Sequence, residues 1–390
     1  MITVSQALDQ LFSLVSPLDV ENVPLREASG RVLARDVAAT RTQPPFAASS
    51  MDGYAVRRAE VEPDAMFKVI GEAAAGHRFE GTMRAGQAVR IFTGAPMPQG
   101  ADFIIIQEDV TRRGDLITLG HRVGTKDNIR PAGGDFSAGE LMTAPRLLRP
   151  ADIALLAAMN IATVPVTRKP IVAILATGDE LVQPGETPGP DQIIASNSYG
   201  LAAMVEGIGA TARMLPIAAD TEAALIQAFG LAKGADLIVT IGGASVGDHD
   251  LVAPVAAKLG MEQAFYKVAM RPGKPLMAGR LGDAAMVGLP GNPVSAMVCG
   301  TVFLGPMIRL MLGLATEPAL RRSVPLARAI PANGPREHYM RAQLQDGQVH
   351  PESQQDSSLL SILATADVLM VRPIDDPARE IGEMVQVIDI

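Results

Sequence analysis

A glycine-rich loop that follows an apolar run is the first stretch that could do chemistry. It reads TIGGASVGDHDL, and its residues Gly242, Gly243 and Ser245 can offer backbone N–H groups to an anion. The loop nevertheless ends in the carboxylate of Asp248, and it lacks the Gly-Lys-Ser/Thr ending of a nucleotide-binding P-loop. Tight turns for packing would explain such a loop if it stood alone.

Two further carboxylates follow apolar runs of the same kind. Glu180 lies in TGDE and Asp220 in AAD, at the ends of segments that we expect to be strands of one sheet. Three carboxylates in one crevice repel one another unless a cation lies among them, and hard oxygen ligands near phosphate favour Mg²⁺. We therefore predict that Glu180, Asp220 and Asp248 hold magnesium. The alternative is helix capping, by Asp220 for TEAALIQ and by Asp250 for LVAPVAAKL.

A basic segment, YKVAMRPGKP, places Lys267, Arg271 and Lys274 close together. In an extended strand Lys267 and Arg271 project to the same side, and the Pro-Gly turn re-aims Lys274. Three cations suit an anionic substrate, to which each charge-assisted hydrogen bond contributes about 1.5–3 kcal/mol. For Lys267 a charged, solvated edge strand is the alternative.

The segment GLPGNPVS reads as a strand, a turn and a helix that begins near Pro293. Backbone N–H groups at this helix start and the Ser295 hydroxyl could meet an anion. Asn292 as a simple helix N-cap is the alternative.

Two segments nearer the N-terminus have unusual turns. In SSMDGYAVR, Asp52 and Tyr54 flank a glycine where the apolar periodicity breaks, and in RIFTGAPMPQGAD, Thr93 and Gly94 end a strand at a Gly/Pro turn. The five histidines show no metal-ligand spacing, so we assign them no metal.

The elements that must position these residues alternate from about residue 169 to 313 between strand and helix patterns. This alternation is typical of a three-layer α/β domain with a parallel sheet. Loops at the carboxyl ends of such strands face one crevice, where open α/β sheets bind their ligands. We expect TGDE, AAD, GGASVGD and GLPGNP to meet there.

The fold class we predict is multidomain, with this central α/β domain and three β-rich or mixed parts. The domains expected are a discontinuous elongated N-terminal domain at 1–45 and 144–168, an inserted β domain at 46–143, the α/β domain at 169–318 and a small C-terminal β-barrel at 319–390. The N-terminal helix and the PADIALLAAMN segment could pair within the discontinuous domain.

Composition limits the class of protein. The chain has 390 residues, 48% of them hydrophobic, and a formal net charge of -8, which argues against general nucleic-acid binding. A single cysteine and an N-terminus without a basic leader indicate a cytoplasmic protein. The apolar run 294–308 is shorter than the roughly 20 residues of a membrane span, so we expect a buried helix and no membrane association.

Taken in order, SSMDGYAV, FTGAPMPQGAD, ATGDEL, GGASVGD, RPGKP and GLPGNPVS resemble the molybdopterin molybdenumtransferase family, which comprises the MoeA proteins and the homologous E domain of gephyrin. The resemblance covers essentially the whole chain. It implies an elongated homodimer that completes molybdenum cofactor synthesis by inserting molybdate into adenylylated molybdopterin, with Mg²⁺-dependent release of AMP. It also implies a crevice shared between the α/β domain and the β insert of the other subunit, and transient contacts with molybdopterin adenylyltransferase and molybdoenzyme chaperones.

The resemblance assigns further site residues by position. Asp52 and Thr93 match site positions on the insert, the three carboxylates match the acidic cluster, and the three cations match a strand thought to hold molybdate and phosphate. The remaining matches are Pro290 and Pro293 at the helix-start turn, Asp135, and, in the C-terminal barrel, Arg341 and Ser357. Two departures stand out: position 271 is Arg where many members have Lys, and QQDSSLLS lacks the histidine often found beside the serine.

Two other functions compete with this prediction. A nucleotide pyrophosphatase that shares the α/β domain would cleave ordinary nucleotides, but it gives no reason for MDGYA and TGAP. A non-catalytic, gephyrin-like scaffold would allow the acidic cluster to decay, whereas here Glu180, Asp220 and Asp248 are all present. We therefore expect an enzyme.

Overall fold

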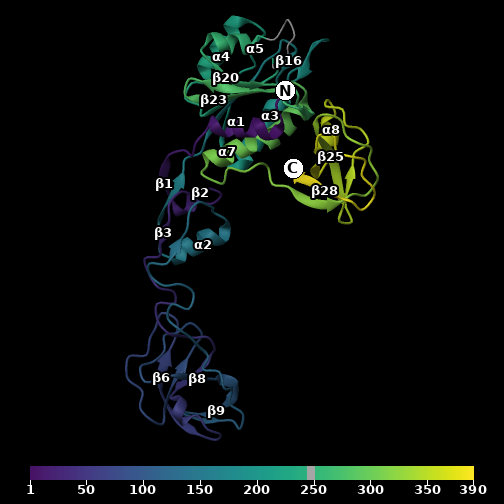
Figure 1. Cartoon of the computed structure of the whole chain (residues 1–390). Coiled ribbons are helices and arrows are strands. Elements are labelled where there is room, and N and C mark those ends of the chain that lie inside the picture. The colour runs from purple at the N-terminus through teal and green to yellow at the C-terminus, as the bar shows by residue number, and fades with distance from the viewer. Residues whose placement is uncertain (244–250) are drawn as a thin grey trace.

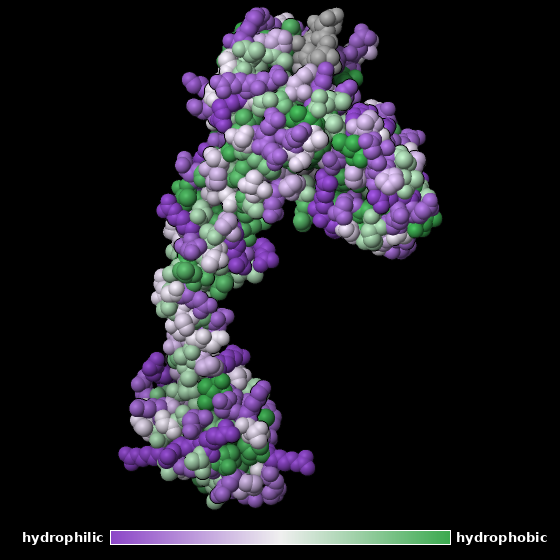
Figure 2. All heavy atoms as spheres, viewed as in Figure 1, coloured by the Kyte–Doolittle hydropathy of each residue, from purple (hydrophilic) through white to green (hydrophobic). Residues whose placement is uncertain are grey.

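The computed structural model describes residues 1–243 and 251–390 (Figure 1). The chain is elongated, with the α/β unit at one end and the β-rich insert at the other. The C-terminal β unit lies beside the α/β unit. Figure 2 shows the insert as a separate lobe joined to the rest by a narrow neck.

The α/β unit is built on a six-stranded sheet. Its strands are, in spatial order, β18 (Thr211–Met214), β15 (Ile171–Ala176), β19 (Leu237–Ile241), β23 (Ala284–Leu289), β22 (Met277–Leu281) and β20 (Glu262–Tyr266). The first four are parallel to one another, as predicted, whereas β22 runs in the opposite direction and pairs antiparallel with both β23 and β20. The reversed direction of β22 follows from a two-residue hairpin, in which Gly282 and Asp283 join β22 to β23.

Helices cover both faces of this sheet, which confirms the three-layer fold class. One face packs against α3 (Asn197–Ile208) and against the helical run that begins at Pro293, and the other packs against α4 (Glu222–Leu231) and α5 (Val252–Lys258). Thr221, and not Asp220, is the N-cap of α4, because its side chain accepts a hydrogen bond from the Ala224 N–H. Strands β19 and β23 are buried along their whole length, as expected of central parallel strands.

The apolar run after Pro293 is a continuous helix made of three parts. These are α6 (Pro293–Cys299), a π-helical turn η4 (Gly300–Leu304) and α7 (Gly305–Met311). Over Pro293–Met311 it is long and apolar enough to cross a membrane, but 78% of its most apolar window is buried inside the protein. A buried core helix therefore accounts for it, and no other described helix meets the same test.

The N-terminal helix α1 (Val4–Ser13) packs against α7 and β20, in the same core as the central sheet. The expected pairing of α1 with α2 (Pro150–Ala158) is therefore wrong. The α1 face formed by Val4, Ala7, Leu8 and Leu11 is buried there, whereas α2 packs on a separate core. The helical spacing of these four residues marks the buried face of α1 but does not specify its partner.

That separate core lies under strands from both sides of the insert sheet. They are β1 (Val20–Pro24), β2 (Val32–Leu33), β13 (Arg146–Leu147) and β14 (Thr163–Thr167) in one sheet, and the pair β3 (Val37–Ala38) with β12 (Leu141–Met142). A further pair, β4 (Ala48–Ser49) with β11 (Ile129–Arg130), belongs to the insert, where Ile129 packs on one of its cores. Segments before and after the insert thus pair with each other. The domain bounds themselves stay a prediction.

The insert is built on a six-stranded sheet. Its strands are, in order, β8 (Phe103–Ile106), β5 (Gly53–Val56), β7 (Gln87–Ile91), β6 (Met66–Ala73), β10 (Leu116–Leu119) and β9 (Val110–Arg113). Short 3₁₀ turns include η3 (Gln107–Asp109). Cores on both faces of this sheet, one around Tyr54 and Phe103 and one around Ile91 and Ile104, make the insert a compact β unit.

The C-terminal unit is a small barrel. Its sheet runs β21 (Met270–Arg271), β25 (Glu337–Gln345), β27 (Val368–Arg372), β28 (Met384–Asp389) and β24 (Arg322–Pro325), with β26 (Gln348–Pro351) on β25. A parallel bridge between Leu326 and Val349 closes β24 against β26. Strand β21 comes from the α/β unit, so the two units share a sheet edge.

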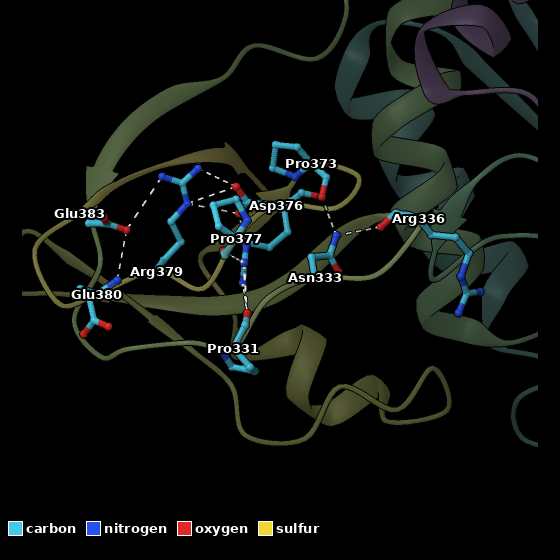
Figure 3. Close-up of polar contacts among 10 residues, drawn as sticks. Pro331, Asn333, Arg336, Pro373, Asp376, Pro377, Arg379, Glu380 and Glu383 are labelled. Atoms are coloured by element: carbon cyan, nitrogen blue, oxygen red, sulfur yellow. Dashed lines mark hydrogen bonds and ion pairs between the residues drawn. The ribbon is translucent and has the colours of Figure 1, made fainter.

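A buried ion network fixes one corner of the barrel (Figure 3). Asp376 is 5% exposed and accepts hydrogen bonds from Arg379, at 2.6 Å, and from the buried Arg372. Burial alone would raise the pKa of Asp376, but the hydrogen bonds from these two arginines outweigh burial and leave the pKa below its ordinary value. Asp376 is therefore an ionised, fully paired carboxylate.

Candidate active site

The loops that follow β15 and β19 meet where the sheet connections diverge. From β15 the chain runs through α3 to β18 on one side, while β19 lies on the other side. The Thr177 N–H donates to the Ile241 carbonyl at 3.1 Å, and a Cβ on Gly242 would lie 3.0 Å from the Thr177 carbonyl oxygen. Gly242 has a φ of 91°, so a side chain there would meet both strain and a close backbone. Such divergence points are where open α/β sheets bind ligands.

The turn after β23 completes this edge of the sheet. The Gly242 N–H donates to the Leu289 carbonyl at 3.1 Å, and a Cβ on Gly291 would lie 3.7 Å from the Gly242 Cα. From the start of α3, the Asn197 side-chain amide donates to the Gly291 carbonyl at 2.7 Å. Three loops far apart in the sequence are thereby held in direct contact.

These loops enclose a cavity of about 700 Å³. The predicted site residues that line it are Glu180, Asp220, Gly242, Gly243, Pro290 and Pro293. The structure thus brings these residues together, while their roles stay a prediction. Ser245 and Asp248, with His249 and Asp250, lie outside the described residues.

Glu180 and Asp220 are the described carboxylates of the predicted magnesium site, and both are exposed at the cavity. The glycine at 178 leaves room for Glu180, because a Cβ there would lie 2.4 Å from its Oε2. The Asp220 backbone N–H donates to Asp179 Oδ1 at 3.1 Å, which fixes the loop that carries Asp220.

The donor set of this cavity is compatible with Mg²⁺. Within 1–243 and 251–390 no group of three or more His, Cys, Asp or Glu side chains could hold a metal ion. Magnesium, however, is commonly held by one or two carboxylates together with substrate phosphates and waters. Glu180 and Asp220 supply that number of carboxylates at a cavity open to a phosphate.

The basic segment does not form the single strand that we predicted. Lys267 has a φ of 68° and turns the chain out of the sheet after β20, while Arg271 lies in β21 against the barrel. Lys267 and Arg271 therefore do not share one strand face. The Lys267 ammonium instead lies 4.8 Å from the centre of the Tyr266 ring. Lys274 is exposed, and the next residue, Pro275, lines the cavity.

Arg341 occupies a different place from a substrate-binding side chain. It is 0% exposed, and its guanidinium donates to the carbonyls of Asp356, at 3.0 Å, and Gln354, at 3.1 Å. In the same strand, burial first and then the nearby charge of Arg271 together lower the pKa of His338 to about 4.

The loop that Arg341 holds reaches the cavity through Ser358. The Ser357 carbonyl accepts a hydrogen bond from the Val294 N–H at 3.1 Å, in the first turn of α6, and the cavity is lined by Ser358. Asn292 is the N-cap of α6 but makes no side-chain capping bond, and Ser295 is 3% exposed and does not line the cavity. The Val294 N–H therefore donates to a carbonyl of the barrel and is not free to bind an anion.

The insert residues form a second group at the other end of the chain. Asp52 Oδ1 accepts hydrogen bonds from both the N–H and the Oγ of Thr93, each at 2.8 Å. Within one chain this pair does not meet the cavity, because the insert and the α/β unit lie at opposite ends (Figure 1). Asp135 is exposed on the loop between β11 and β12, where its N–H donates to the Gln43 carbonyl.

We expect Thr93→Val to raise the pKa of Asp52. The backbone hydrogen bond from Thr93 is the main cause of the lowered pKa, and the hydroxyl bond is the next. The variant removes only the hydroxyl bond, so the pKa should rise part of the way to its ordinary value. Carboxyl ¹³C titration by NMR measures it, with Thr82→Val on the same insert as the control; an unchanged Asp52 titration would contradict this account.

Several lining residues were missed by the sequence analysis. They are Thr177, Ile193, Ile194, Ser196, Asn197, Ser198, Pro275, Gly291 and Ser358. Ile193 and Ile194 belong to β17 (Ile193–Ile194), which pairs with β16 (Leu181–Val182) in a two-stranded flap directly after Glu180. The signal that could have found Asn197 is its position, because it begins α3 directly after the strand β17.

Three parts of the chain match models of known protein families. Residues 173–310 match the family model described as "Probable molybdopterin binding domain". Residues 2–160 match "MoeA N-terminal region (domain I and II)", and 323–390 match "MoeA C-terminal region (domain IV)".

Whole-chain comparisons agree. The chain is 36% identical to a molybdopterin molybdenumtransferase of Nostoc sp., over 100% of this chain and 94% of that protein, and 37% identical to one of Haemophilus influenzae, over 80% and 78%. The crystal structure of a molybdopterin biosynthesis MoeA protein from Pyrococcus horikoshii superimposes with a TM-score of 0.86 at 28% identity, covering 100% of both chains. The chain belongs to the molybdopterin molybdenumtransferase (MoeA) family.

Proposed function

We propose that this protein completes molybdenum cofactor synthesis by inserting molybdate into adenylylated molybdopterin. Water attacks the phosphoanhydride between the molybdopterin phosphate and AMP, so that AMP leaves and the molybdopterin phosphate is freed. The two dithiolene thiols bind molybdenum, and their two protons leave with one molybdate oxygen as water. The observation that carries the proposal is the meeting of the loops after β15, β19 and β23 around one cavity, in a chain whose relatives carry this enzyme's name.

Each loop has a part in this proposal. The backbone N–H groups around Gly242 and Gly243, with Ser245, support the phosphates of the adenylyl group. Arg271 and Lys274, with Lys267, supply the positive charge that attracts molybdate and the pterin phosphate. Pro290 and Pro293 shape the turn at the cavity wall. In place of direct substrate contact, Arg341 holds the loop that carries Ser357 and Ser358.

Glu180 and Asp220, with Asp248, hold Mg²⁺ in this proposal. An ion bound there would neutralise charge on the phosphoanhydride and polarise it.

We also propose that the working enzyme is a homodimer with a shared site. The support is that Asp52 and Thr93 lie at the far end of the chain from the cavity. A second subunit whose long axis runs antiparallel to that of the first would bring its insert to this cavity. We further propose a cytoplasmic location and transient contacts with molybdopterin adenylyltransferase, which supplies the substrate, and with molybdoenzyme chaperones, which receive the product.

The test is incubation of the purified protein with adenylylated molybdopterin, Mg²⁺ and molybdate. We expect AMP release together with active cofactor, and we expect Glu180→Gln to lower the rate about a hundredfold, because charge stabilisation by a bound metal is worth several kcal/mol. Calorimetric titration of Mg²⁺ should show weaker binding to the variant.

Glu262→Gln is the matched control, since Glu262 is an exposed glutamate of the same unit outside the cavity. Cleavage of ordinary nucleotides without molybdopterin would favour a pyrophosphatase instead. Wild-type turnover in Glu180→Gln would remove Glu180 from the site.

A further inference from the structure

The Asp52–Thr93 pair is held by one arginine of the insert that lies outside the pair itself. Arg90 is in β7, directly opposite Tyr54 of β5. Its guanidinium carbon lies 5.0 Å from the centre of the Tyr54 ring and 4.7 Å from that of Phe92. Contacts with two rings restrict the orientation of the guanidinium plane.

The hydrogen bonds of Arg90 lead to both flanks of Asp52. One amino group donates to the Gly53 carbonyl at 3.2 Å, and the other donates to Gln107 Oε1 at 2.6 Å. The Gln107 backbone N–H in turn donates to the Asp52 carbonyl at 3.1 Å. Arg90 thus ties together the residue after Asp52 and the residue that binds its backbone.

Asp52 itself uses a different set of contacts. Its Oδ1 is engaged by Thr93, and its backbone is engaged by Gln107. Gly53 allows the close approach of β8 on which this depends, because a Cβ there would lie 2.0 Å from the Ile105 carbonyl oxygen. The direction of the Asp52 side chain therefore depends on the position of the start of β5 between β7 and η3.

We propose that Arg90 is a positioning residue that fixes the start of β5 so that Asp52 keeps its two hydrogen bonds to Thr93. This inference rests on the proposed function, in which Asp52 acts at the cavity of a second subunit. Arg90 does not contact the substrate in this account. Its positive charge also favours the ionised form of Asp52.

Arg90→Met removes both donors while keeping an apolar chain over the rings. We expect kcat to fall about tenfold and KM for adenylylated molybdopterin to change less than about twofold, since positioning acts on the reacting geometry. In an Asp52→Asn background the same change should lower kcat less than about twofold, because residues that act through one another are not additive. Arg90→Lys keeps the positive charge but lacks the planar guanidinium with its several donors, so its kcat should lie between those of wild type and Arg90→Met.

The matched control is Arg58→Met. Arg58 also stacks on a ring of the insert, 5.1 Å from the centre of Phe103, and donates to the Thr125 carbonyl, but it makes no contact with Asp52 or its neighbours. Its effect should be the same in the wild-type and Asp52→Asn backgrounds.

Hydrogen exchange at the Thr93 amide gives a readout that needs no activity. Arg90→Met should exchange this amide faster, and Arg58→Met should not. Equal loss of kcat in the two backgrounds, or unchanged Thr93 exchange, would overturn the inference. If Arg90→Met does not fold, Gln107→Ala removes the same link and faces the same two outcomes. Two results together would separate this inference from the proposed function. If Asp52→Asn kept full activity while Arg90→Met still exchanged the Thr93 amide faster, the proposed role of Asp52 would be overturned, but the positioning by Arg90 would stand.

Discussion

A mixed dimer of two inactive chains, one Asp52→Ala and the other Glu180→Gln, is expected to recover activity. If each active site combines the insert of one subunit with the cavity of the other, both changes fall in one of the two active sites. The other active site then has an intact insert and an intact cavity. Dimers purified through two different affinity tags should therefore show about half the wild-type activity per dimer, from parents with almost none. AMP release measures it.

The control for this experiment pairs two changes on the same side of the site. A mixed dimer of Asp52→Ala and Thr93→Ala carries a damaged insert at both sites, so it should stay as inactive as its parents. If the first mixed dimer were also inactive, the insert and the cavity would have to act within one chain, which the separation of the two groups along the chain opposes.

The largest effect on stability is expected for Asp376→Asn. The change leaves the guanidinium of Arg372, whose side chain is 3% exposed, without its buried carboxylate partner. Breaking a buried ion pair from one side costs about 3–5 kcal/mol. Because a multidomain chain does not unfold in one step, hydrogen exchange of the β27 amides is the suitable measure of the barrel's local opening free energy.

Asp389→Asn is the matched control in the same barrel. Its side chain is 66% exposed and pairs with Arg322 at 2.7 Å, so its loss should cost less than about 1 kcal/mol. The pH dependence gives a second check. Since the folded pKa of Asp376 is lowered, its contribution is complete above the unfolded value of about 3.9 and is lost as pH falls through the folded value. The difference in local opening free energy between wild type and Asp376→Asn should disappear only in that acid range. A difference that disappears near neutral pH would contradict the assignment.

Local sequence signals located most of the elements. Alternating strand and helix patterns between residues 169 and 313 predicted the three-layer unit, because parallel strands with helical connections must bury both sheet faces. Glycine and proline turns after apolar runs located the loops that carry Glu180, Gly242 and Pro290, since loops at the carboxyl ends of neighbouring parallel strands meet at one edge. These signals are local in the chain and so are visible in it.

What the sequence could not predict depends on contacts between distant segments. The left-handed backbone at Lys267 breaks the predicted basic strand, and β21 then joins the barrel. In the same way α1 shows an apolar stripe, but only packing decides that it covers α7 and β20. Periodicity specifies which face is buried and not what covers it.

By itself, then, the sequence determined the order and type of the units, the family motifs and the chemistry that their side chains offer. Tertiary structure decided which of those side chains meet. Glu180 follows β15 and Asp220 follows β18, and the two residues line one cavity because these strands are parallel neighbours in the sheet. Asp52 and Thr93 instead bond to each other in the insert, at the opposite end of the chain. The physical reason is that side-chain chemistry is a property of each residue, while proximity is set by long-range packing that no local segment encodes.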